Sequence, residues 1–226
     1  MPDLSKTLRE YPRFSDLVQN SKPYRKLDFT ENNADLMRRD FSETSAFSDY
    51  VSRELLSENT FNGIGGYAEN RIIYRHRKHF TDSDKPRSIH LGIDIWTDAG
   101  EPVHAPLDGI VHSYAFNDHY GDYGPTIILA HELSGATFYT LYGHLSLESL
   151  KDIYQGKPIS AGENFAFIGP YPENGDWPPH LHFQIISDIG GYRGDFPGVS
   201  SVEEQDYYLA LCPDPDLILR ICWKLT

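Results

Sequence analysis

The sequence predicts an all-β core, a partly open β-sandwich or barrel of the duplicated hybrid-motif type, with an N-terminal helical extension. Two observations predict this fold class. From about residue 88 the chain consists of short segments rich in β-branched and aromatic residues, punctuated by glycine and proline. Two phrases, 100–111 and 156–163, look like paired halves of one motif, because each is a turn that feeds a strand.

Residues 1–60 differ in character from the rest of the chain. Segments 33–40 and 45–56 have helix-like spacing, and the second carries an apolar stripe made of Phe47, Val51 and Leu55. Such a stripe is typical of packing against a core, and the alternative is a lid or inhibitory segment over a cleft. We therefore expect a partly helical extension over 1–60 and a β domain with a C-terminal tail over 61–226.

Six strands are expected in the β domain, bounded by glycine and proline turns. They are 93–96, 109–116, 126–131, 137–144, 163–169 and 181–187. A turn at 132–135 joins two of them into a hairpin that ends at His144. The stretch from residue 190 onward is expected to form loops and a short apolar tail.

The composition of the chain indicates which binding partners and which cellular compartment to expect. The formal net charge of −13 argues against a nucleic-acid partner, because nucleic-acid binding needs basic patches. No run of about 18 apolar residues is present, so no membrane span is expected. The first ten residues lack the apolar core of a secretory signal peptide, so we expect a cytoplasmic protein, or a secreted one if a signal has been removed. Cys212 and Cys222 are expected to be free thiols rather than a disulfide.

The pair His180 and His182 is the first candidate for metal chemistry. The segment 180–186 alternates polar and apolar residues, which indicates a strand. Side chains at positions i and i+2 of a strand lie on one face, about 7 Å apart. That separation allows one imidazole to bind a metal while the other faces a reacting water or a substrate.

His90 and Asp94 form the second candidate pair. A fully extended strand would hold these side chains about 13 Å apart, so chelation requires a bend, and Gly92 permits one. Histidine nitrogen and aspartate oxygen both suit zinc, and three protein ligands with one open position are typical of a catalytic site. With only two cysteines, both far from these motifs in sequence, a structural cysteine site is disfavoured.

Either pair alone is weak evidence, because the chain contains 10 histidines. The stretches 87–95, 140–146 and 179–183, however, follow one another with β-like segments between them. In this order they resemble the lysostaphin-type zinc metallopeptidases, a family of glycyl-glycine and cell-wall peptide endopeptidases, over roughly residues 61–187. Segment 66–71 loosely matches the family's entry motif, which ends in arginine.

The resemblance implies site residues and a cofactor. One zinc ion per chain would be held by His90, Asp94 and His182, and His144 and His180 would be the catalytic histidines. The implied reaction is hydrolysis of a peptide or peptide-like amide bond by a metal-activated water. One catalytic histidine would act as general base, and the other would stabilise the oxyanion or protonate the leaving amine. The sequence leaves open which histidine takes which role.

Departures from the family pattern concern the substrate. The family's small-residue approach to the histidine pair is replaced by a rigid wall, Trp177-Pro178-Pro179, and Gln184 stands where glutamate is more common. Trp177 is therefore a candidate substrate-binding residue. Tyr142 is another, because it lies two residues before His144 on the expected strand, with a packed aromatic as the alternative. Two alternative functions remain: a non-catalytic or regulatory binding module with the peptidase fold, and a cytosolic amidase acting on a non-wall substrate.

Overall fold

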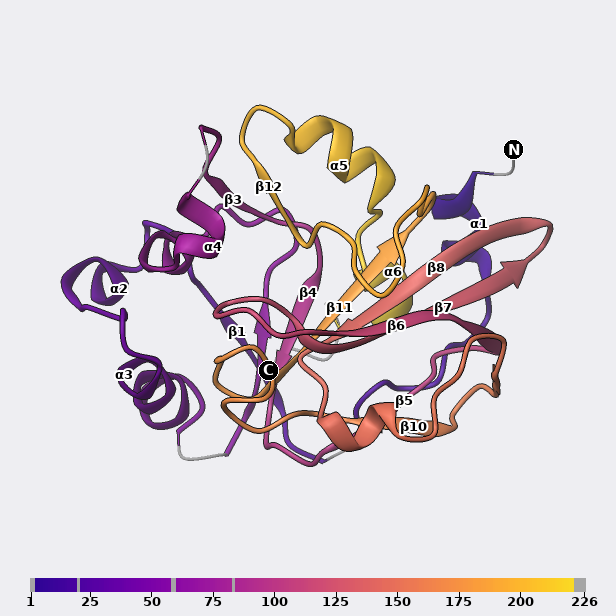
Figure 1. Ribbon diagram of the computed structural model, residues 1–226, viewed down its shortest axis with the longest axis horizontal. Coiled ribbons are helices and arrows are strands. Elements are labelled where there is room, and N and C mark those ends of the chain that lie inside the picture. Colours follow the sequence, from indigo (N-terminus) through magenta and orange to yellow (C-terminus); the bar gives the residue numbers. More distant parts are fainter. Residues whose placement is uncertain (1–2, 20, 58–59, 83, 222–226) are drawn as a thin grey trace.

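An open sheet of eight strands forms the centre of the protein (Figure 1). The structure is a computed structural model and describes residues 3–19, 21–57, 60–82 and 84–221. In spatial order, the strands of the large sheet are β1 (Tyr24–Leu27), β2 (Asn62–Gly65), β4 (Ile93–Trp96), β11 (His180–Ile186), β8 (Ala136–Gly143), β7 (Gly124–Leu133), β6 (Gly109–Asn117) and β9 (Pro158–Ile159).

The large sheet is mixed, because β1 and β2 are parallel while the other neighbours are antiparallel. Two small antiparallel sheets accompany it: β5 (Pro102–His104) pairs with β10 (Asn164–Phe167), and β3 (Arg87–His90) pairs with β12 (Val199–Ser201). Within the described residues, the edge strands β1 and β9 do not pair with each other, so no closed barrel forms. The predicted all-β, partly open fold class is confirmed.

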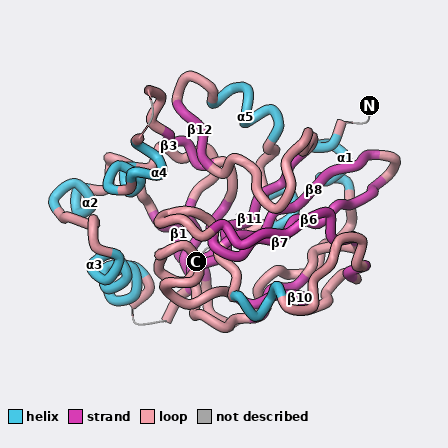
Figure 2. Tube along the Cα trace, in the orientation of Figure 1, coloured by secondary structure: helices cyan, strands magenta, loops and turns pink. Residues whose placement is uncertain are grey.

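Helices are short and lie around the sheet, and Figure 2 shows how little of the chain they occupy. They are α1 (Leu4–Glu10), α2 (Ala34–Arg38), α3 (Thr44–Asp49), α4 (Lys78–Thr81), α5 (Gln205–Leu211) and α6 (Asp216–Leu219). A π-helical turn, η1 (Tyr50–Leu55), continues α3, and the 3₁₀ turns are η2 (Ile72–His76) and η3 (Leu147–Leu150). In the described part of the chain, none of these helices has the length and apolar content needed to cross a membrane.

The β7–β8 hairpin shows why the sequence pattern succeeded in this region. Leu133 pairs with Ala136 across a two-residue loop, and both loop residues, Ser134 and Gly135, have positive φ. Loops of this kind match the right-handed twist of the flanking strands, and glycine adopts that backbone without strain. The predicted hairpin is therefore confirmed.

Strand β11 separates the core from the face that carries the histidine pair. Its alternate residues Leu181, Phe183 and Ile185 are fully buried in the largest apolar cluster. The residues between them, His180, His182 and Gln184, point to the opposite face, as strand alternation requires. On that face, Trp96 packs with Phe47 of α3 and with Phe29. The candidate site therefore lies between the sheet and a second, aromatic cluster.

Within the described residues, the segments near the two ends of the chain contain more regular structure than the sequence pattern indicated. The two helical segments expected between residues 33 and 56 are confirmed as α2 and as α3 with η1. After residue 190, where loops were expected, the chain forms β12, α5 and α6, so that prediction is wrong in part. The reason is long-range: β12 forms by pairing with β3, and α6 packs against α1 at the other end of the chain. Cys222 lies outside the described residues, and the boundary at residue 60 stays a prediction.

Candidate metal centre and active site

Strand register brings the two predicted pairs together. In the β4–β11 ladder His182 lies opposite Asp94, and His180 lies opposite Trp96. Directly opposed residues of an antiparallel pair point to the same face, with β-carbons about 5 Å apart. The histidine pair and Asp94 are therefore neighbours because of strand pairing, although 86 or more residues separate them in sequence.

The bend expected at Gly92 is present between β3 and β4. It brings His90 Nε2 to 3.2 Å from Asp94 Oδ1, where an extended strand would keep them far apart. Gly92 also provides space: a β-carbon there would lie 2.6 Å from His182 Cε1 and 2.7 Å from the Phe183 carbonyl oxygen. The position thus requires glycine for close approach as well as for the bend.

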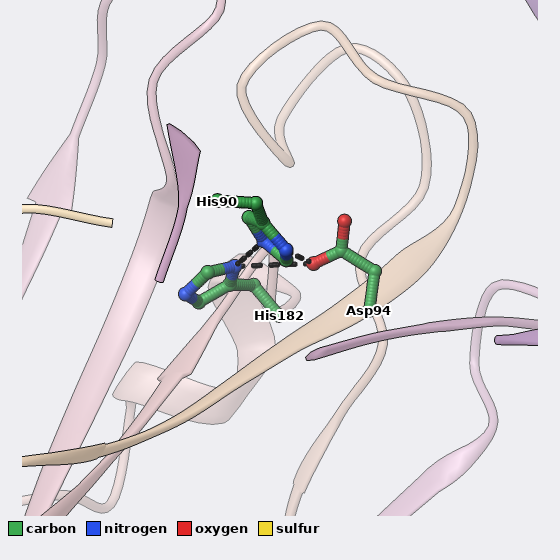
Figure 3. Close-up of side chains that lie close together, drawn as sticks. All are labelled: His90, Asp94 and His182. Carbon is green, nitrogen blue, oxygen red and sulfur yellow. Dashed lines mark hydrogen bonds and ion pairs between the residues drawn. The ribbon is translucent and has the colours of Figure 1, made fainter. Parts of the chain in front are cut away.

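The donor atoms of His90, Asp94 and His182 form a small triangle (Figure 3). His90 Nε2 lies 3.0 Å from His182 Nδ1, and His182 Nδ1 lies 3.1 Å from Asp94 Oδ1. In a tetrahedral zinc site with ligand bonds of about 2.0–2.1 Å, ligand atoms are separated by about 3.3 Å. The side chains present therefore fit a zinc ion in donor type and in spacing.

Hydrogen bonds orient the rings of His90 and His182 so that the nitrogen facing the triangle carries no proton. His90 Nδ1–H donates to the Gly66 carbonyl oxygen at 3.0 Å, and His182 Nε2–H donates to Gln184 Oε1 at 2.9 Å. The Gln184 amide is held in turn by donating to the Pro197 carbonyl oxygen and to Cys212 Sγ, each at 3.1 Å. Such partners commonly fix the tautomer and the ring orientation of metal-binding histidines. Gln184 therefore fits a supporting role behind the triangle.

Arg71 neutralises the carboxylate of the triangle. Its Nη1 donates to Asp94 Oδ2 at 2.5 Å, and its Nε donates to Glu69 Oε2 at 2.8 Å. Burial alone would raise the pKa of Asp94, but His90 and Arg71 together hold it well below its usual range. Asp94 is thus ionised, with Oδ1 free to bind a cation. Arg71, the last residue of the segment that loosely matches the family's entry motif, therefore lies at the site.

His144 and His180 lie beside the triangle with their ring centroids 4.1 Å apart. The Nδ1–H of His144 donates to the Asn174 carbonyl oxygen, and that of His180 donates to the Pro178 carbonyl oxygen, both at 2.7 Å. Burial lowers the pKa of His180 to about 4 and that of His144 well below its ordinary value. Both rings are therefore neutral at pH 7, and each leaves Nε2 as an available base.

Tyr142 does not line this site, which corrects the expectation from the strand pattern. It is fully buried in the core, where its hydroxyl lies 3.0 Å from Thr140 Oγ1 and its ring packs on Phe165 and Phe183. The reason is that β8 ends at Gly143 and His144 has a left-handed backbone with φ of 61°. Strand alternation is broken there, so His144 turns towards the triangle while Tyr142 stays in the core.

A pocket of about 130 Å³ opens beside these groups. Its walls include Asp94, His144, His180 and His182, with further contributions from 73–74, 79–80, 121–123 and 195–199. Trp177 lines it as expected, whereas none of residues 1–60 in the described part of the chain does. The five predicted metal and catalytic side chains belong to residues only 1–6% exposed. The site is thus enclosed, and residues from the segment 71–80, rather than described residues of the segment 1–60, contribute to its walls.

Two supporting residues of the site were not singled out from the sequence. Tyr123 packs against His144 and His182, with its hydroxyl 3.5 Å from His182 Nε2. Asn174 orients His144 through its carbonyl oxygen, and its side chain donates to the Gly169 and Trp177 carbonyl oxygens. Both lie in loops whose local sequence shows no metal-site spacing. Only the fold brings them to the site.

Part of this chain is similar to known proteins. Residues 88–192 match the family model described as peptidase family M23. The catalytic domain of lysostaphin from Staphylococcus simulans is 23% identical, with 54% of this chain and 80% of that chain covered and a TM-score of 0.38. A putative peptidase M23 from Pseudomonas aeruginosa is 21% identical, with coverages of 60% and 47% and a TM-score of 0.37.

A zinc-containing peptidase from Vibrio cholerae is 25% identical, and the match covers 43% of this chain and 27% of that chain, with a TM-score of 0.32. The chain therefore spans most of the lysostaphin catalytic domain but less than half of the other two proteins. No curated protein matches the chain.

Proposed function

We propose that this chain, whose residues 88–192 match the model of peptidase family M23, is a zinc-dependent metallopeptidase that hydrolyses a peptide or peptide-like amide bond. The observation that carries the proposal is the triangle of His90 Nε2, Asp94 Oδ1 and His182 Nδ1, with edges of 3.0–3.2 Å. It lies at the wall of a pocket that two further histidines also line.

In this proposal, His90, Asp94 and His182 hold one zinc ion. When bound, zinc polarises a carbonyl as a Lewis acid and lowers the pKa of water towards ~7. Asp94 brings one negative charge to the ion, while Arg71 and Glu69 balance the charge behind it. Gly66 and Gln184 keep both imidazoles in the tautomer that presents a lone pair.

His144 and His180 carry out the proton transfers. Each ring donates from Nδ1 to a backbone carbonyl, so Nε2 of one can accept a proton from the attacking water. The proton taken up at that Nε2 then passes to the leaving nitrogen, directly or through the other ring, whose Nε2 stabilises the developing oxyanion only while it carries this proton. His180 is held against Trp96 by a stack at 4.1 Å, and His144 is held by Asn174, so both bases are rigidly placed before substrate binds. Trp177 forms part of the substrate-binding wall.

A hydrolysis assay tests this proposal. Purified protein is incubated with glycine-rich peptides, cell-wall peptide fragments and simple amides, first after chelator treatment and then with one equivalent of zinc. We expect cleavage of at least one peptide with zinc, none after chelation, and a loss of about 10²-fold or more in His144→Ala, since general acid–base catalysis contributes about 10²–10⁴-fold.

The outcomes separate the alternatives. Cleavage of simple amides without any peptide cleavage would favour an amidase acting on a non-wall substrate. A zinc-loaded protein that cleaves nothing in the panel would favour a binding module that keeps the peptidase fold. Cleavage that is insensitive to chelation would contradict metal-assisted hydrolysis.

A further inference from the structure

The walls of the pocket carry buried nitrogen donors that have no acceptor. In the described part of the chain, five buried side-chain nitrogen or oxygen atoms lack a hydrogen-bond partner: Arg71 Nη2, Arg77 Nη1, Trp96 Nε1, Trp177 Nε1 and Ser200 Oγ. Arg71, Trp96 and Trp177 line the pocket, and the Arg77 guanidinium stacks 3.6 Å from the centre of the Trp177 ring. Three of the five unpartnered atoms therefore belong to residues of the pocket wall, and a fourth belongs to a residue stacked on that wall.

These atoms share one chemical requirement. Guanidinium and indole nitrogens donate hydrogen bonds and accept none. A buried donor without a partner destabilises the folded protein, so buried polar groups in native proteins are nearly always paired. A group rich in acceptor oxygens would satisfy them, and an ammonium or apolar group would not.

Two of the donors converge beside the metal triangle. A β-carbon built on Gly65 would lie 2.5 Å from Arg71 Nη2 and 3.3 Å from Trp96 Nε1, so both nitrogens lie next to the same residue of β2. Gly65 is the register partner of Asp94, and Trp96 stacks on His180. An oxygen ligand held by both nitrogens would therefore lie close to the groups that carry out hydrolysis.

Charge differs between the inner and outer parts of the pocket. The donors belong to residues no more than 4% exposed, and so does Asp94, whose carboxylate is paired with Arg71. The other two carboxylates on the pocket wall, Asp122 and Asp195, belong to residues in contact with solvent. With zinc bound as proposed, the metal and Arg71 together outweigh the charges of Asp94 and Glu69, so an anionic group is favoured at the inner end and disfavoured at the rim. A cavity of about 130 Å³ is comparable to one that accommodates a benzene-sized molecule, so it fits a chain end better than an extended chain.

We propose that the substrate of this site is a short peptide with a free C-terminal carboxylate, which Arg71 Nη2 and Trp96 Nε1 bind at the inner end of the pocket. This inference rests on the proposed function and names the substrate class. Hydrolysis adds one water across the last amide bond: the hydroxyl goes to the acyl carbon, a proton goes to the leaving nitrogen, and the C-terminal amino acid is released.

A matched pair of substrates tests the inference. The zinc-loaded protein is assayed on triglycine as the free acid and as its C-terminal amide. We expect kcat/KM to be about 10–100-fold higher for the acid, since a hydrogen bond to a charged group contributes about 1.5–3 kcal/mol. Trp96→Phe keeps an aromatic ring beside His180 but removes the N–H, so it should reduce that preference several-fold. Tyr142→Phe removes a buried hydroxyl outside the pocket and should leave the preference unchanged.

A binding measurement separates failure of this inference from failure of the proposed function. Titration calorimetry on the zinc-loaded His144→Ala variant compares the same acid and amide without turnover. Tighter binding of the acid would support the carboxylate site even if no peptide were cleaved. Cleavage of both peptides with equal kcat/KM and equal affinity would overturn the inference and leave the peptidase proposal intact. If Trp96→Phe fails to fold, the wild-type comparison still decides.

Discussion

Gly92 is the residue at which the metal triangle has the least space. A β-carbon there would lie within 2.7 Å of His182 Cε1 and Nε2 and of the Phe183 carbonyl oxygen. In Gly92→Ala, the His182 ring and the backbone at Phe183 must therefore shift, which disturbs the triangle. We expect at least a tenfold loss in zinc affinity, measured by competition with a chromophoric chelator, and a stability loss of about 1–3 kcal/mol from overpacking.

Gly191→Ala is the matched control, because a β-carbon at Gly191 meets no atom within 4 Å. Its zinc affinity should equal that of the wild type. If Gly92→Ala binds zinc as tightly as Gly191→Ala, the account of the close approach at His182 is wrong.

At the level of residues, the sequence was informative where local spacing carries the chemistry. The His180–His182 pair and the His90–Asp94 pair are recognisable because strand alternation and a glycine bend act over a few positions. Tyr142 was misplaced because the positive φ of His144 cannot be read from spacing. The unpartnered donors of Arg71 and Trp96 were not predictable either, since partners are known only after folding.

At the level of elements, α3 supports the site from behind. Phe47 is 2% exposed, and its ring centroid lies 6.0 Å from that of Trp96 and 6.3 Å from that of Trp177. Phe47→Ala should therefore destabilise the protein by about 3–5 kcal/mol. Urea unfolding measures the change.

Phe116 on β6 supplies the comparison, because it is 42% exposed. We expect Phe116→Ala to cost less than about 1 kcal/mol. Equal unfolding free energies for Phe47→Ala and Phe116→Ala would show that α3 does not share a cooperative core with the sheet.

Six strands of the β domain were predictable from alternation and turn residues, and β4 matches its expected bounds residue for residue. Strands β1 and β2 were missed. Asn62–Gly65 contains two glycines, which have low strand propensity, and it becomes a strand because it pairs with β4 and β1. Strand β12 was missed for the same reason, since its partner β3 lies more than 100 residues earlier. A strand that forms through pairing with a distant segment is hard to recognise from the alternation of its own few residues.

At the level of the whole molecule, buried neutral histidines should make stability depend on pH. Burial lowers the pKa of His90, His131 and His180 to about 4. Between about pH 6.5 and 4 the folded protein therefore binds fewer protons than the unfolded chain, so the free energy of unfolding falls as pH falls through this range. Each histidine contributes up to about 3 kcal/mol to this loss.

Urea unfolding of the zinc-free protein at several pH values measures the effect. His131, which bonds the Asp108 carbonyl oxygen and Thr140 Oγ1, lies outside the candidate site. His131→Gln should therefore show a smaller loss of stability between pH 6.5 and 4 than the wild type. An unfolding free energy that stays constant over this range would contradict the burial of neutral histidines.

The central claim is that His90, Asp94 and His182 hold one catalytic zinc while His144 acts beside it. Elemental analysis of the purified wild type, His182→Ala and His144→Ala tests it most directly. We expect about one zinc per chain in the wild type and in His144→Ala, and none in His182→Ala, as three protein ligands are needed for a catalytic zinc site. A wild-type protein that contains no metal and cannot be loaded with zinc would contradict the account.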